Sequence, residues 1–74
     1  MNKLQIRLDT QGDVHEFVGL ANSIDCSVYL EDGTGFRADG KSLLGVMYGM
    51  TEFKSLYVLS DYENLATKFN KFML

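Results

Sequence analysis

The pattern of hydrophobic and polar residues along the chain predicts four β-strands. Over residues 4–8, hydrophobic residues alternate with polar ones, which is the period of a strand with one face towards solvent. The same alternation recurs over residues 26–30. Asp32 and Gly33 then favour the tight reversal of a hairpin leading to a third strand. The apolar run over residues 56–59 predicts a fourth strand.

Two segments between these strands show the spacing of amphipathic helices. The first helix is predicted to begin near Asp13, because apolar residues recur there at three- and four-residue intervals. These residues are Val14, Phe17, Val18, Ala21 and Ile24. A second, short helix is predicted over residues 41–49. Asp39 or Gly40 precedes it, and Gly49 provides a stop.

A closing helix is predicted after the fourth strand. Ser60 and Glu63 have the spacing of a capping box, in which two side chains satisfy free N–H groups at a helix start. The apolar stripe of this helix consists of Tyr62, Leu65, Ala66, Phe69 and Met73. Since no linker or repeat interrupts residues 1–74, we expect one α+β domain in the order β-α-β-β-α-β-α. Helices on one face of a four-stranded sheet would make an open-faced sandwich.

The composition of the chain narrows its class. Hydrophobic residues make up 46% of the 74 residues and charged residues 23%, as in domains that fold alone. A net charge of -3 without a Lys/Arg cluster argues against binding to nucleic acid or anionic membranes, which needs a basic face. No apolar stretch is long enough to span a bilayer. Because its single cysteine, Cys26, cannot form an intramolecular disulfide, we expect a cytoplasmic protein.

Residues 35–42, from Gly35 to Ser42, match the phosphate-loop pattern G-x-x-x-x-G-K-[ST]. A working loop of this kind also needs a parallel strand before it and a second acidic strand that holds the metal. The 32 residues beyond Ser42 leave no room for the crossover units that would supply them. A small nucleotide-binding protein is therefore an alternative only. Lys41 and Ser42 are expected to open a helix, where backbone N–H groups attract phosphate.

Residues 41–47 read KSLLGVM, and the first predicted helix carries Phe17 and Val18 followed by Ala21. Together with the element order, these features resemble the histidine-containing phosphocarrier family, the HPr proteins of the sugar phosphotransferase system. The resemblance implies a four-stranded antiparallel sheet with three helices on one face. In one branch of the family, an HPr kinase/phosphorylase phosphorylates the serine that corresponds to Ser42.

The chain departs from the family at the phosphocarrier site. HPr proteins carry phosphate on a histidine in a His-x-Arg-Pro motif just before the first helix, and Thr10 occupies the matching position here. None of the next three residues is an arginine, the chain contains no proline, and the carboxylate of Asp13 would repel an incoming phosphate. We therefore expect no phosphocarrier activity and no catalysis. A rearranged carrier site at His15 is the alternative, although His15 lies more than a turn inside the predicted helix.

The resemblance also indicates what kind of partner to expect. In the family, the positions that match Leu43, Leu44 and Met47 form a docking patch for proteins. Lys41 adds a positive charge next to Ser42, and we expect it to contact a partner together with these three residues. The predicted function is a non-catalytic, HPr-like regulatory or interaction protein, switched by phosphorylation of Ser42. Its implied partners are an HPr-type kinase, phosphotransferase components or a transcriptional regulator of carbon use. No cofactor or metal is expected.

Overall fold

The computed structural model describes all 74 residues and has the predicted order of elements. The elements are β1 (Asn2–Ile6), α1 (Gln11–Asn22), β2 (Val28–Glu31), β3 (Arg37–Asp39), α2 (Leu43–Glu52), β4 (Leu56–Ser60), α3 (Leu65–Lys68) and a 3₁₀ turn, η1 (Asn70–Phe72). The α+β class and the order β-α-β-β-α-β-α are therefore confirmed. None of the helices has the length and the apolar character that crossing a bilayer requires.

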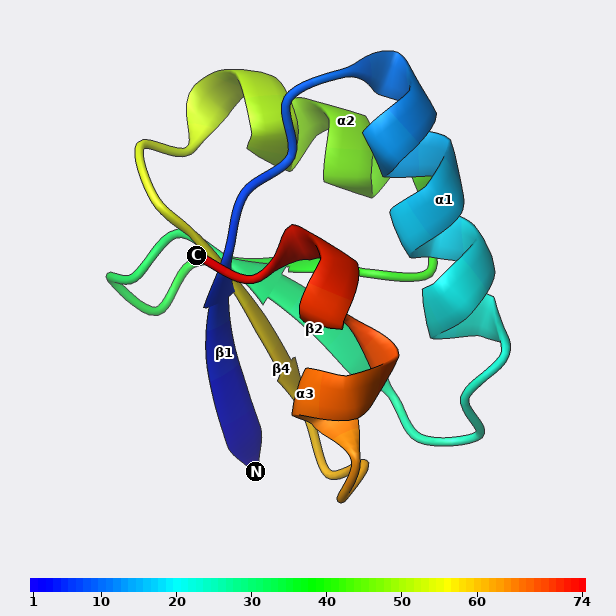
Figure 1. Ribbon diagram of the computed structural model, residues 1–74. Coiled ribbons are helices and arrows are strands. Elements are labelled where there is room, and N and C mark those ends of the chain that lie inside the picture. Colours follow the sequence, from blue (N-terminus) through cyan, green and yellow to red (C-terminus); the bar gives the residue numbers. More distant parts are fainter.

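The four strands form one antiparallel sheet in the order β1-β4-β2-β3. β4 lies between β1 and β2, as Figure 1 shows, although it comes last of the strands in the sequence. Its register places Val58 opposite Leu4 on one side and opposite Leu30 on the other. The sheet is therefore complete only when the two halves of the chain have come together.

The core lies on the face of the sheet that carries the even-numbered strand residues. Ile6, Leu30 and Val58 project from this face, and all three are buried. Every helix adds side chains to the same cluster: Val14, Phe17 and Ala21 from α1, Val46 from α2, and Leu65, with Phe69 and Phe72 just after it, from α3 and η1. The helices thus all pack against this face.

The opposite face of the sheet carries a buried carboxylate. Glu31 is only 5% exposed, and its two oxygens lie 3.0 Å from Lys3 Nζ and 3.3 Å from Arg37 Nε. Lys3 belongs to β1 and therefore reaches across β4 to meet a residue of β2. Hydrogen bonds from Lys3 and then from Arg37 hold the pKa of Glu31 below its usual range. The three charges tie β1, β2 and β3 together.

The second helix differs from the prediction at both ends. It runs from Leu43 to Glu52, with Ser42 as its N-cap, and Gly49 does not end it. Gly49 is buried, and a Cβ at this position would overlap the side chain of Leu30. This glycine therefore allows α2 to pack closely on β2, so it serves packing instead of helix termination.

The predicted capping box at Ser60 and Glu63 is wrong. Ser60 is the last residue of β4, fully buried, and its hydroxyl donates to the Ser27 carbonyl at 2.8 Å. The same oxygen accepts a hydrogen bond from the backbone N–H of Tyr62. A side chain held in this way by its neighbours is not available to cap a helix. α3 begins only at Leu65, and no side chain caps it.

The closing segment is shorter than the predicted helix. α3 ends at Lys68, and the chain then turns through η1, which puts Phe72 into the core and leaves Met73 44% exposed. The reason is pairing with β1: the Arg7 N–H donates to the Phe72 carbonyl at 2.8 Å, and Met73 forms an isolated bridge with Ile6. A continuous helix would not present these backbone groups to the strand.

Replacing Glu31 with glutamine tests whether the buried carboxylate stabilises the sheet. Because the folded-state pKa of Glu31 is lowered, its contribution is fully present above the ordinary carboxyl pKa and is lost as the pH falls through the folded-state value. We expect Glu31→Gln to have a lower melting temperature than the unmodified protein at neutral pH, with the difference closing below about pH 4. Thermal unfolding followed by circular dichroism across this pH range measures the effect.

The exposed Glu63 offers a matched control, because no ion pair or hydrogen bond holds its side chain. Glu63→Gln should follow the unmodified protein at every pH. A difference between Glu31→Gln and the unmodified protein that stays constant from neutral to acidic pH would contradict an ionic role for Glu31.

Candidate functional site

At the start of α1, the carboxylate of Asp13 is hydrogen-bonded to backbone N–H groups. Thr10 is the N-cap, and its Oγ1 accepts a hydrogen bond from the Asp13 N–H at 3.1 Å. Asp13 Oδ2 accepts in return from the backbone N–H groups of Asp9 at 2.9 Å and Thr10 at 3.2 Å. These bonds, the one from Asp9 first, lower the pKa of Asp13. The capping box of this protein thus lies at Thr10, where the resemblance would place a phosphohistidine.

The cations around Thr10 are already paired. Arg7 Nε lies 2.9 Å from one carboxylate oxygen of Asp9, and Lys71 Nζ lies 2.6 Å from Glu16 Oε1. Two of these charged residues, Arg7 and Lys71, line a hollow of about 290 Å³ together with Asp9 and Asp13. A phosphate on this surface would meet two carboxylates and no free cation.

The structure keeps His15 apart from this arrangement. His15 is exposed on α1, beyond the first helical turn that begins at Gln11, and its ring has no hydrogen-bond partner. Its neighbouring backbone N–H groups are inside the helix, where they bond to carbonyls of the preceding turn. Nothing in the structure orients the His15 imidazole or supplies donors for a phosphate upon it.

The start of α2 is built in a different way. Ser42 Oγ accepts a hydrogen bond from the Gly45 N–H at 3.2 Å, so Ser42 is the N-cap and is half-buried. The turn before it is fixed by Asp39, whose carbonyl accepts from the Ser42 N–H at 3.1 Å and whose carboxylate accepts from the Lys41 N–H at 2.9 Å. No acidic residue lies in the first turn of α2.

The hydrogen bonds of Lys41 join two parts of the fold. Its Nζ donates to the carbonyl of Ile24 at 2.6 Å, which directs the ammonium group towards the segment after α1. Its own carbonyl accepts from the side-chain amide of Asn22 at 3.1 Å. Both contacts join the end of α1 to the start of α2. Contact between Lys41 and a partner stays a prediction.

The predicted docking residues divide between surface and core. Leu44 is 80% exposed and Leu43 is 37% exposed, so both present apolar surface directly after Ser42. Met47 is half-buried and packs against the core cluster. The structure therefore brings Ser42, Leu43 and Leu44 together on one surface, whereas the side chain of Met47 packs against the core.

Three aromatic side chains in and near the later part of α2 were not predicted from the sequence. Phe53, which follows α2, has its ring centroid 5.8 Å from that of Phe36 and 6.0 Å from that of Tyr48, both in edge-to-face geometry. Phe36 and Tyr48 are 57% and 53% exposed. The only signal in the sequence was that Tyr48 follows Leu44 by four residues, which places them on one helix face. Phe36 joins them only through the fold.

Residues 35–42 do not form one continuous loop. Arg37–Asp39 is strand β3, paired antiparallel to β2, and no strand of the sheet is parallel to its neighbour. The strand before the segment therefore has the wrong direction for a phosphate loop, which follows a parallel strand. No group of three or more His, Cys, Asp or Glu side chains is arranged to hold a metal ion.

Comparison of the chain with protein-family models finds no match, and comparison with curated proteins finds no relative. The surroundings of Thr10 and Ser42 are therefore the main guide to function.

Replacing Thr10 with alanine tests the capping box. We expect Thr10→Ala to lower the free energy of unfolding by about 1 kcal/mol, because the Asp13 N–H loses its acceptor at a helix start. Urea unfolding measures this difference. Thr67→Ala is the matched control, since Thr67 is exposed in α3 and its hydroxyl has no hydrogen bond. Equal stability of Thr10→Ala and Thr67→Ala would show that Thr10 does not cap α1.

Proposed function

We propose that this protein is a non-catalytic, HPr-like regulatory or interaction protein, in which phosphorylation of Ser42 changes the binding of protein partners. The α+β fold, with its four-stranded antiparallel sheet, is compatible with an HPr-like open-faced sandwich. The partners we propose are an HPr-type kinase, components of the sugar phosphotransferase system, or a transcriptional regulator of carbon use.

The observation that carries the proposal is the position of Ser42 next to exposed leucine side chains. Ser42 is the N-cap of α2, and Leu44, two residues on, is 80% exposed. A phosphate on Ser42 would meet the unpaired N–H groups and the positive end of the helix dipole. Its charge would lie beside apolar surface, so it could change which partner binds without unfolding the domain.

The surroundings of Thr10 support the non-carrier part of the proposal. Thr10 has no ring nitrogen to accept a phosphoryl group, and the backbone donors next to it bind Asp13. Since a phosphohistidine at a helix start depends on such donors and on a free cation, the site lacks both requirements.

The first test concerns the phosphocarrier reaction. Incubation with phosphoenolpyruvate and the first enzyme of the phosphotransferase system should give no acid-labile phosphoprotein, because neither Thr10 nor His15 has the surroundings of a phosphohistidine. Intact-mass spectrometry at alkaline pH detects the product, and an ordinary HPr protein serves as the positive control. Stoichiometric phosphate that disappears in His15→Ala would establish the carrier alternative.

The second test concerns Ser42 and its neighbour Leu44. An HPr-type serine kinase should add one phosphate to the protein and none to Ser42→Ala. Leu44→Ala should raise the KM of the kinase reaction several-fold and change the stability of the protein by no more than about 0.5 kcal/mol, since Leu44 is exposed. Steady-state kinetics and urea unfolding measure the two quantities.

Leu74, which is 68% exposed at the far end of the chain, provides the matched leucine control. Leu74→Ala should leave the KM unchanged. Absence of phosphate on Ser42, with a kinase that modifies ordinary HPr under the same conditions, would refute the regulatory proposal. Equal effects of Leu44→Ala and Leu74→Ala would refute docking at Leu44.

A further inference from the structure

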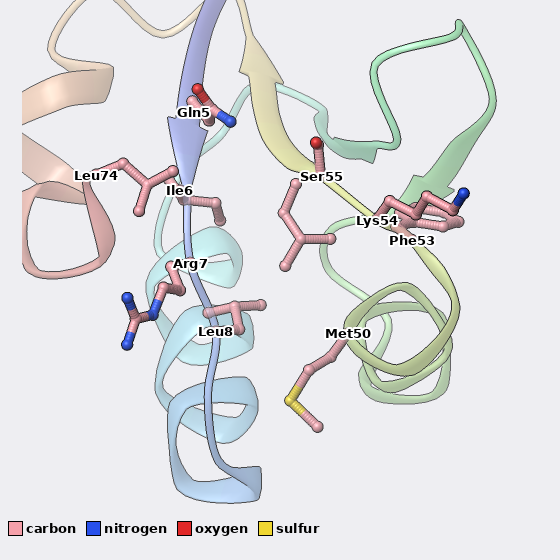
Figure 2. A pocket seen from close by; sticks show the side chains of 10 residues that line it. Gln5, Ile6, Arg7, Leu8, Met50, Phe53, Lys54, Ser55 and Leu74 are labelled. Atoms are coloured by element: carbon pink, nitrogen blue, oxygen red, sulfur yellow. The ribbon is translucent and has the colours of Figure 1, made fainter.

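The core opens to the surface at the end of α2 opposite to Ser42. A hollow of about 250 Å³ lies there between the end of β1, the end of α2 and the C-terminal residues. Six hydrophobic residues line it: Ile6, Leu8, Met50, Phe53, Leu56 and Leu74. Figure 2 shows the side chains of Ile6 and Leu8 on one side of the opening and that of Met50 on the other. An apolar group entering here would contact the core directly.

Two charged side chains line this hollow, and both are positive. Arg7 and Lys54 are the charged side chains in its lining, and no Asp or Glu side chain lines it. In Figure 2 the guanidinium group of Arg7 and the ammonium group of Lys54 lie on opposite outer sides of the opening. Arg7 is bound to Asp9, whereas Lys54 is exposed and has no ion-pair partner. The rim therefore offers one free cation in a protein whose net charge is -3.

Size and polarity together define the ligand class. The volume of the hollow lies just below the range for small-molecule pockets, so a compact ligand fits best. The apolar lining favours a hydrocarbon or aromatic body, and the free ammonium group of Lys54 favours a negative charge at one end. Gln5 and Ser55 add polar side chains to the lining.

We propose that this hollow is a binding site for a small organic acid with an apolar body and a single carboxylate. The body lies against Leu8, Met50 and Leu56, and the carboxylate pairs with Lys54. This site is independent of Ser42, because its lining comes from the end of α2 and not from its start.

Titration with 4-phenylbutyrate, followed by NMR of the full chain, tests the proposal. Chemical-shift changes should concentrate at residues 6–8, 50 and 53–56, with a Kd on the order of 1 mM, as expected for a ligand of this size in an open site. 4-Phenylbutylamine has the same body with the opposite charge and should bind at least about threefold more weakly. Acetate, which lacks the body, should produce no shifts at these residues.

A charge-removing variant separates the ion pair from the apolar contact. Lys54→Gln should weaken 4-phenylbutyrate binding about threefold, the effect of one exposed ion pair, and leave 4-phenylbutylamine no weaker. Lys68→Gln, on α3 and outside the lining, should change neither. The proposal is overturned if the amine binds the same residues as tightly as the acid, if Lys54→Gln binds the acid unchanged, or if the shifts scatter over the surface.

Discussion

The central position of β4 is the constraint on which the rest of the structure depends. β4 pairs with β1 on one side and with β2 on the other, so its residues join the first strand of the chain to the hairpin of β2 and β3. Side chains alternate across a strand, and this register turns Val58 and Leu56 towards the helices. A shift by one residue would place Tyr57 in the core and Val58 in solvent, with the loss of the cluster that holds all three helices.

The two long helices begin with the same device in different surroundings. Thr10 and Ser42 both accept a hydrogen bond from the N–H three residues on. In α1 that third residue is Asp13, whose carboxylate accepts hydrogen bonds from the backbone N–H groups of Asp9 and Thr10. In α2 it is Gly45, which has no side chain, and the first turn contains no acidic residue, although the carboxylate of Asp39 lies just before the cap and accepts from the Lys41 N–H. An added phosphate would therefore meet a carboxylate within the first turn of α1 and none within the first turn of α2.

α2 connects the two surfaces to which we assign functions. Its first residues present Leu43 and Leu44 next to Ser42, and its last turn, with Phe53 after it, borders the hollow. Val46 and Gly49 are buried on the face between them, and Gly49 allows the close approach to Leu30 that fixes the helix on β2. Binding at either end therefore acts on a helix that the core holds in place, which favours local effects over refolding.

The sequence by itself determined the class of the fold and the order of its elements, because periodicity records which side of an element is buried. It did not determine which side chains from distant parts of the chain contact one another. The burial of Glu31 depends on Lys3, two strands away, and the aromatic contacts of Phe53 depend on Phe36 from the hairpin. Ser60 matched a local capping pattern but was taken up by β4, because long-range strand pairing outweighs a cap of about 1 kcal/mol. Such choices belong to the tertiary structure, which alone decides what each side chain meets.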